Sequence, residues 1–390
     1  MSPRIRLTLW YVLFLAAVGA LHPYLAVVLD DAGASGRSKA AILSLFPAGS
    51  MIAGPGLTWV ADRTGKSVTV LRISVGVSAA MALVLACGLS LWWMVPCLGI
   101  LSFARAPSTS IVDMLTARRL GMGKAGYGSV RAWGSVGFIA SAAGVGLLLD
   151  SAPLAPLYVH GAFLLGLAVL TLRIPVEEEQ PNPSSSAAIT EVLRRPVLVA
   201  LYGVGILHQS TISFYDHFYA LHVTRTLELG SWVASASIVL GVGLEVLVLA
   251  RGHSLLRRIG PGALIVLGVA SGLPRWLITA ETTDPLLLIA TQSLHGIGFG
   301  AWWVGAIALV DRHAPGRLRN SAQGLFMASS HGFGTLLAMT AAGMLLDRTS
   351  TAAVFMSSAG FSALALIGAC TVLLPALRKA STSEAESPSR

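Results

Sequence analysis

Residues 173–196 read R-I-P-V-E-E-E-Q-P-N-P-S-S-S-A-A-I-T-E-V-L-R-R-P and form the longest polar interval before the C-terminal tail. Prolines, serines and the acidic run Glu177–Glu179 leave this stretch too little apolar surface to fold alone, so it is predicted to be a linker. The sequence on either side is almost entirely apolar, with short polar breaks. The linker therefore separates two halves of similar length.

The two halves resemble each other in short segments. Gly146–Asp150 reads G-L-L-L-D and Gly343–Asp347 reads G-M-L-L-D, while Arg63–Gly65 reads R-T-G and Arg258–Gly260 reads R-I-G. The two offsets agree to within about two residues, as expected of a duplicated unit.

The composition is that of a membrane protein. Charged residues make up 12% and hydrophobic residues 54% of the chain, whereas soluble proteins average about 25% charged residues. Apolar runs of about 20 residues recur, which is the length that crosses a bilayer as a helix. Lipid cannot hydrogen-bond the backbone, and the runs are too long for barrel strands, so the fold class is predicted to be an all-α polytopic membrane protein.

Twelve transmembrane helices are predicted, six in each half. The spans are 7–29, 40–60, 69–88, 91–113, 128–149, 153–173, 196–221, 230–250, 261–280, 284–310, 319–346 and 352–374. The resulting domains are an N-terminal six-helix bundle (1–173), a cytoplasmic linker (174–195), a C-terminal six-helix bundle (196–377) and a disordered cytoplasmic tail (378–390). Equal numbers of helices predict two pseudo-symmetric bundles with a binding site between them near the midplane.

The basic residues predict the orientation. Of the 27 Lys and Arg residues, 21 fall on the side of the two termini. Only Arg37, Lys39, Arg225 and Arg348 fall on the other side. Because Lys and Arg accumulate on the cytoplasmic side, both termini are predicted to be cytoplasmic. This topology accounts for the net charge of +9, so nucleic acid is not expected as a partner.

One loop resembles a known family. Gly54–Lys66 reads G-P-G-L-T-W-V-A-D-R-T-G-K and is similar to the signature loop between helices 2 and 3 of the major facilitator superfamily. Gly65 lets the loop turn tightly, and Asp62 and Arg63 can pair across helix ends. The resemblance implies that Asp62, Arg63, Gly65 and Lys66 form a conformational loop.

Three further segments resemble one branch of that superfamily. They are G-A-L-H-P-Y-L-A-V-V-L-D (19–30), Y-G-S-V-R-A-W-G-S-V-G-F (127–138) and Q-S-L-H-G-I-G-F-G (292–300). They look like the lactose permease, nucleoside and phenylpropionate proton symporters, and the resemblance covers nearly the whole chain. It implies the major facilitator fold and alternating access with proton symport.

The resemblance also implies roles for particular residues. In lactose permease-like proteins the arginine that matches Arg131 pairs with an acid, here Asp113, and both bind substrate. A structural ion pair is the alternative for these two residues.

The coupling helices of the branch carry an acid, an arginine and a histidine, which correspond to Glu245, Arg275 and His295. The sugar permeases add a glutamate one turn after the histidine, where this chain has Gly298. The resemblance implies that Glu245, Arg275 and His295 couple proton movement to transport, and this departure puts the sugar-permease arrangement in question. A structural Glu245–Arg275 bridge is the alternative.

The charges inside the spans are functional candidates in their own right. They are Arg105, Asp113, Arg131, Asp216, Glu245 and Arg275. An ionisable group at the bilayer centre costs several kcal/mol unless it meets a partner or water. Arg105 adds a cation suited to bidentate recognition of a carboxylate, and a permanent pair with Asp216 or Glu245 is the alternative.

Polar and aromatic neighbours extend the candidate site. Gln209, Ser213 and Asp216 share one face of a helix, which favours Asp216 as a substrate contact over the histidines nearby. His295 is a candidate for substrate binding as well as coupling. Trp302, which follows it in the same helix, is predicted to stack on a substrate, with core packing as the alternative.

These patterns together predict a secondary active transporter, not an enzyme, for a small organic solute: an aromatic or other carboxylate, a sugar or a nucleoside. Proton-coupled efflux of a drug or metabolite is the first alternative, and the absence of proline in 134–150 favours uptake. A membrane-embedded enzyme, a sensor or a scaffold is the alternative of another class. The expected partners are the solute, protons and the lipid bilayer of the bacterial inner membrane. The chain is expected to be a monomer without metal or cofactor.

Overall fold

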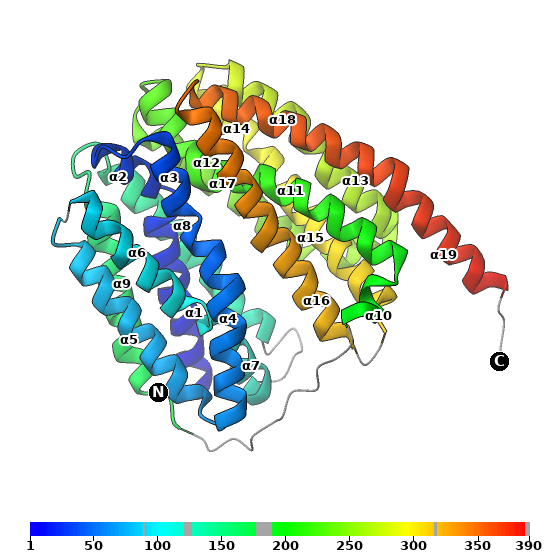
Figure 1. The fold of residues 1–390 in the computed structure, drawn as a ribbon, viewed down its shortest axis with the longest axis horizontal. Coiled ribbons are helices and arrows are strands. Elements are labelled where there is room, and N and C mark those ends of the chain that lie inside the picture. Colours follow the sequence, from blue (N-terminus) through cyan, green and yellow to red (C-terminus); the bar gives the residue numbers. More distant parts are fainter. Residues whose placement is uncertain (89, 121–126, 177–188, 316–317, 387–390) are drawn as a thin grey trace. The chain divides into compact units, whose positions relative to one another are not determined.

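The computed structural model describes residues 1–390 except 89, 121–126, 177–188, 316–317 and 387–390. The run Glu177–Glu179 and most of the predicted linker lie outside the described residues. The described chain folds into helices joined by short turns, with no strand (Figure 1).

The first half of the sequence forms α1 (Pro3–Leu21), α2 (Leu25–Asp31), α3 (Gly36–Leu43), α4 (Leu45–Thr64), α5 (Ser67–Leu85), α6 (Leu91–Arg105), α7 (Ser108–Leu120), α8 (Ser129–Leu148) and α9 (Ala155–Leu172). The second half forms α10 (Ile189–Leu193), α11 (Pro196–Leu221), α12 (Ser231–Ala250), α13 (Gly252–Glu281), α14 (Pro285–Thr291), α15 (Ser293–His313), α16 (Arg319–Met327), α17 (Thr335–Leu346), α18 (Thr351–Gly368) and α19 (Leu374–Glu386). Within the described residues, π-helical segments extend some of these helices: η2 (His222–Thr226), η4 (Ala328–Gly334) and η5 (Ala369–Leu373).

Eleven helical stretches of the described chain are long and apolar enough to cross a membrane. The remaining predicted span, 319–346, is helical throughout, because η4 joins α16 to α17. The prediction of an all-α polytopic fold is confirmed.

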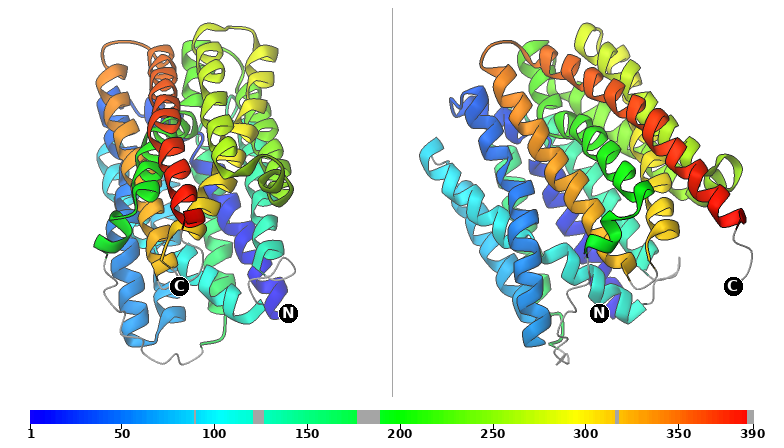
Figure 2. Two further views of the ribbon diagram at one scale, coloured as in Figure 1. Left: turned by 90° about the vertical axis from the view of Figure 1, so that its right-hand side faces the viewer. Right: turned by 45° about the vertical axis from the view of Figure 1, so that its right-hand side comes forward.

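The chain forms two compact units. The first contains Met1–Ser185 and Asp216–Val239, and the second contains Ser186–Tyr215 and Leu240–Arg390. The end of α11 and the start of α12 therefore pack with the first half of the sequence. Long helices lie side by side within each unit (Figure 2). In the first unit α1 packs mainly against α8 and α9, and in the second unit α13 packs mainly against α15 and α18.

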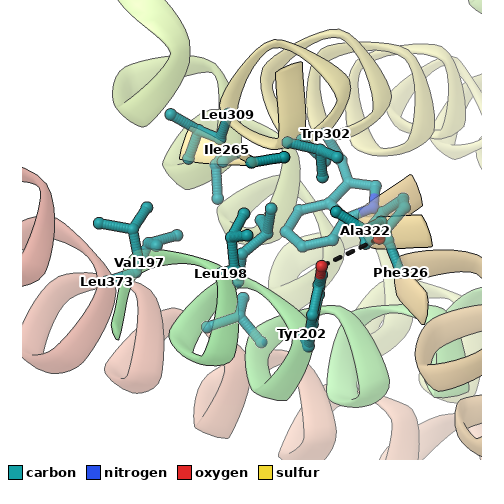
Figure 3. Close-up of a cluster of buried hydrophobic side chains, with 14 of the residues drawn as sticks. Val197, Leu198, Tyr202, Ile265, Trp302, Leu309, Ala322, Phe326 and Leu373 are labelled. Carbon is teal, nitrogen blue, oxygen red and sulfur yellow. Dashed lines mark hydrogen bonds between the residues drawn. The ribbon is translucent and has the colours of Figure 1, made fainter. Parts of the chain in front are cut away.

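The second unit has an apolar core around α11 (Figure 3). Its labelled side chains are Val197, Leu198, Tyr202, Ile265, Trp302, Leu309, Ala322, Phe326 and Leu373. The Tyr202 hydroxyl donates a hydrogen bond to the Ala322 carbonyl at 2.9 Å. The buried hydroxyl of Tyr202 is thereby paired, as burial requires.

The repeated R-x-G segments share a backbone feature. Gly65, which ends α4, has φ +65°, and Gly260, at a kink in α13, has φ +76°. A residue with a Cβ pays about 1–2 kcal/mol in the left-handed region. A tight turn at each position explains why glycine stands at both.

The predicted spans 7–29, 40–60 and 284–310 are interrupted after Leu21, Leu43 and Thr291. Two further predicted elements differ in the structure. The predicted span 91–113 is broken between Arg105 and Ser108, because Pro107 lacks an N–H and its ring clashes with the preceding turn. The predicted disordered tail is helical up to Glu386 in α19, where alanine, lysine, arginine and glutamate favour a helix.

Replacing Gly65 by alanine should destabilise the protein by about 1–2 kcal/mol, because φ there is left-handed. The matched control is Gly56→Ala in the same helix, where an added Cβ meets nothing within 4 Å. Thermal unfolding of the purified variants in detergent should show a lowered midpoint for Gly65→Ala only. Equal midpoints would contradict the turn assigned to Gly65.

Candidate functional site

The first polar cluster of the N-terminal unit joins α1, α7 and α8. The Tyr11 hydroxyl donates to Asp113 Oδ1 at 2.6 Å, and Arg131 Nη1 lies 3.3 Å from the same oxygen. The predicted contact between Asp113 and Arg131 is therefore present. Both side chains are partly exposed, at 34% and 47%. An ion pair with this exposure stabilises by about 1 kcal/mol or less, so the hydroxyl of Tyr11 is a substantial part of what holds Asp113.

The second cluster surrounds Arg105, the last residue of α6. Its Nη2 lies 3.2 Å from His22 Nε2. Its guanidinium carbon is 5.7 Å from the ring centre of Phe14 and 5.3 Å from that of Phe46. In the described part of the chain no carboxylate forms an ion pair with Arg105, so the predicted alternative of a permanent pair with Asp216 or Glu245 is not observed.

The two clusters lie at different levels of α1. Tyr11 belongs to the middle of the helix and His22 caps its C-terminal end. At 1.5 Å per residue they are separated by about 16 Å along the helix axis. Arg131 and Arg105 therefore face different levels of the N-terminal unit.

In the C-terminal unit, three predicted residues form a chain of contacts. Arg275 Nη1 lies 3.1 Å from His295 Nδ1, and His295 Nε2 lies 3.3 Å from Glu245 Oε2. Arg275 Nε also donates to Gln292 Oε1 at 2.9 Å. The structure thus brings Glu245, Arg275 and His295 together, with the imidazole between the acid and the arginine.

Aromatic rings enclose the guanidinium of this chain. Arg275 is only 1% exposed, and its guanidinium carbon lies 4.2 Å from the ring centre of Tyr215 and 4.0 Å from that of Trp276. Such stacking stabilises a desolvated cation by about 2 kcal/mol. Aromatic rings therefore cover the guanidinium, and its Nε and Nη1 atoms are hydrogen-bonded.

The hydrogen-bond donors define the tautomer of His295. Arginine has only donors, so Nδ1 of His295 accepts from Arg275. The proton of the neutral ring is then on Nε2, which faces Glu245. Donation runs in one direction, from Arg275 through His295 to the carboxylate.

A glycine lets the two helices of this chain approach closely. An added Cβ at Gly296 would lie 2.7 Å from the backbone nitrogen of Glu245. Helices in membranes use small residues at such contacts. This close approach of α15 to α12 places His295 within reach of Glu245.

The other two predicted substrate contacts, Trp302 and Asp216, lie in different surroundings. Trp302 is fully buried in the apolar core, where it lies beside Phe326 (Figure 3). The centre of its ring is 6.2 Å from that of Phe326 and 4.8 Å from that of His208. Core packing, the alternative to stacking on a substrate, describes its position. Asp216 is half-buried in the part of α11 that belongs to the first unit, whereas Gln209 lies in the second.

The predicted conformational loop ends α4 and begins α5. Asp62 and Arg63 are exposed, and the guanidinium of Arg63 lies 5.0 Å from the ring centre of Trp59, one turn earlier. Lys66 precedes α5. Neither Asp62 nor Arg63 forms an ion pair within the described residues, which corrects the predicted pairing, because the Arg63 side chain lies along its own helix.

Sequence reasoning missed several side chains of these clusters. Tyr11, Tyr215 and Trp276 are aromatic residues in apolar helices and gave no signal. His22 and Gln292 stand inside the segments that carried the family resemblance, but neither was predicted as a site residue. Among the described residues no group of three or more His, Cys, Asp or Glu side chains could hold a metal ion.

Comparison with known proteins decides the family. Residues 4–357 match the MFS_1 like family. The chain belongs to this family. Membership agrees with the predicted major facilitator resemblance, which is confirmed.

The curated relatives of this MFS_1-like protein are permeases. It is 28% identical to the maltose permease of Geobacillus stearothermophilus over 96% of this chain and 95% of the relative. It is 24% identical to the nucleoside permease NupG of Escherichia coli over 67% and 69%, and 25% identical to a probable 3-phenylpropionic acid transporter of the same organism over 74% and 77%.

Solved structures show the same fold. A crystal structure of a mutant nucleoside transporter NupG aligns with a TM-score of 0.84 at 20% identity, over 95% of this chain and 100% of that one. The protein is a multi-pass membrane transporter for a small molecule, and it is not an enzyme, as predicted.

Replacing Gly296 by alanine should push α15 away from α12 and cost about 1–3 kcal/mol, because the new methyl group would meet the backbone of Glu245. The control is Gly243→Ala, whose Cβ would meet nothing within 4 Å. Thermal unfolding and solute uptake should both fall for Gly296→Ala and stay unchanged for Gly243→Ala. Full uptake by Gly296→Ala would show that the close approach is dispensable.

Proposed function

We propose that the protein is a proton symporter that moves a small organic solute by alternating access. The observation that carries this proposal is the chain from Arg275 through His295 to Glu245 inside predicted spans. The relatives named for maltose, nucleosides and 3-phenylpropionic acid support a small polar solute. In this proposal the protein lies in the bacterial inner membrane as a monomer, with both termini on the cytoplasmic side.

Glu245 is the proposed proton carrier. Its charged carboxylate accepts the N–H of His295, whereas its protonated form no longer needs that donor. Loss of this bond frees His295 to turn, and Arg275 then loses an acceptor. The protonation state of one carboxyl thereby biases the contacts among three helices, which is how a proton can favour one conformation.

Glu245→Gln should abolish accumulation of solute against its gradient and spare counterflow exchange, because the amide mimics a permanently protonated acid. Proteoliposomes with an imposed proton gradient, tested with labelled maltose, uridine and 3-phenylpropionate, provide the measurement. Glu281→Gln, at the exposed end of α13, is the control and should accumulate solute normally. If Glu245→Gln still concentrates solute, the carrier is elsewhere.

Contacts at the end predicted to face outside support the proposed alternating access. Arg225 of η2 forms ion pairs with Asp30, at 3.5 Å, and with Asp31. Lys39 also pairs with Asp30. These contacts join the two halves of the sequence within the first unit.

Hydrogen bonds add to these ion pairs, and together the contacts form a seam between the two halves of the sequence within the first unit. Tyr24 Oη lies 3.2 Å from Ser235 Oγ and donates to the Ala142 carbonyl at 2.7 Å. The backbone N–H of Ser231 donates to Asp150 Oδ2 at 3.0 Å. In the proposed cycle this seam separates when the site opens to the outside.

Arg225→Gln should weaken the seam and favour its opening. Exposed ion pairs contribute about 0.2–1 kcal/mol each, so loss of the two pairs of Arg225 should shift the equilibrium toward opening by roughly twofold to thirtyfold. The measurement is labelling of Ser235→Cys by a membrane-impermeant maleimide, with Cys87, Cys97 and Cys370 replaced. The control is Arg348→Gln, which removes another exposed cation predicted on the same side. Equal labelling of the two variants would contradict the proposal that the seam closes the outer end.

A further inference from the structure

We propose that Arg105 and His22 bind the carboxylate of a monoanionic organic acid. The inference rests on the proposed transport function and names the substrate class. Both residues lie at helix ends in the first unit: Arg105 ends α6 before the break at Pro107, and His22 caps α1. Interrupted helices mark the binding sites of many transporters.

The Arg105–His22 pair resembles the Arg275–His295 pair of the second unit. The nitrogen–nitrogen distances are 3.2 Å and 3.1 Å. The second pair is completed by a carboxylate, because Glu245 lies 3.3 Å from His295. In the described residues no carboxylate completes the first pair. A ligand carboxylate would supply the missing group.

The charge of the cluster defines the charge of its ligand. Arginine cannot accept a hydrogen bond, so His22 Nε2 accepts from Arg105, and the neutral ring carries its proton on Nδ1. The pair therefore has a net charge of one positive unit inside a predicted span, where such a charge is costly until it is neutralised. A monoanion neutralises it, whereas a phosphate dianion leaves a negative charge buried.

The surroundings of the guanidinium favour a flat apolar body next to the carboxylate. Phe14 and Phe46 are 6% and 5% exposed, and the ring of His22 lies 4.6 Å from that of Phe46. These rings displace water from one side of the cation, which strengthens its bond to an anion. One hydrogen bond to His22 leaves most of the five guanidinium N–H groups for the ligand.

Arg131 is excluded as a second ligand for the same carboxylate. It already pairs with Asp113, and the α1 residues that mark the two clusters lie about 16 Å apart along the helix. A carboxylate spans only about 2 Å between its oxygens, so it can engage one arginine but not both. Arg105 is therefore the specific carboxylate ligand.

The test measures binding rather than transport. Purified full-length protein is titrated with 3-phenylpropionate, its neutral amide and phenyl phosphate, by calorimetry. The acid should bind at least about tenfold more tightly than the amide, since charge-assisted hydrogen bonds to a desolvated arginine are strong. Phenyl phosphate should bind more weakly than the acid. Arg105→Lys should abolish the preference for the acid, because lysine lacks the planar fork.

Variants of His22 distinguish a role in positioning Arg105 from a role in folding. His22→Gln keeps an acceptor for Arg105 and should retain the preference, whereas His22→Leu should reduce it. His160→Gln is the control, because His160 is a buried histidine that bonds to the Ala17 carbonyl of α1 and should leave the preference unchanged.

Equal affinity for acid and amide in the wild type overturns the carboxylate site, as does absence of acid binding. An acid preference that survives Arg105→Lys, or tighter binding of phenyl phosphate, also overturns it. None of these outcomes would refute proton symport, because symport is tested separately by the Glu245-dependent accumulation of a neutral solute. Conversely, acid binding through Arg105 without accumulation would refute symport alone.

Discussion

The buried guanidinium of Arg275 is the interaction on which the second unit depends. A cation in a membrane span is costly unless it meets partners or water. Here Gln292 and His295 take up its edges and Tyr215 and Trp276 cover its faces. These residues come from α11, α13 and the junction of α14 with α15. The contacts of a single guanidinium therefore hold these helices together.

Each unit contains a contact between an arginine and a histidine, and the two contacts have different proposed roles. Each contains an arginine that meets a histidine at an interrupted helix: Arg105 at the break after α6, and Arg275 opposite the junction at Gln292. In the second unit the protein supplies the completing carboxylate from Glu245. The proposed roles follow from this difference. The carboxyl of Glu245 carries a proton, and the pair of Arg105 and His22 binds the carboxylate of a ligand.

Much of this arrangement was predictable from the sequence. Long apolar runs gave the spans, and the rarity of charge inside them singled out Glu245 and Arg275, because each isolated charge in a span needs a partner. The break before Ser108 was not predicted, although Pro107 stands inside the predicted span 91–113 and explains it. The partition of the units was not predictable, because a sequence repeat fixes helix number and orientation but not which half the residues 216–239 pack against.

Side chains such as Tyr11 and Tyr215 show the limit of sequence reasoning. Each lies in an apolar helix where aromatic residues are ordinary, and only the fold shows that one donates to Asp113 and the other stacks on Arg275. Trp302 shows the opposite error: its position after His295 suggested a substrate contact, but helix rotation directs it into the core. Spacing along a helix indicates a face, whereas packing decides what that face meets.

The central claim is that Glu245 carries a proton in a chain with His295 and Arg275. Difference infrared spectroscopy tests it directly and needs no substrate. As the pH is lowered, the wild type should gain a protonated-carboxyl band that is absent from Glu245→Gln and shifted in frequency in His295→Gln, because the imidazole donor is lost. A titration that is identical in wild type and Glu245→Gln would contradict the claim.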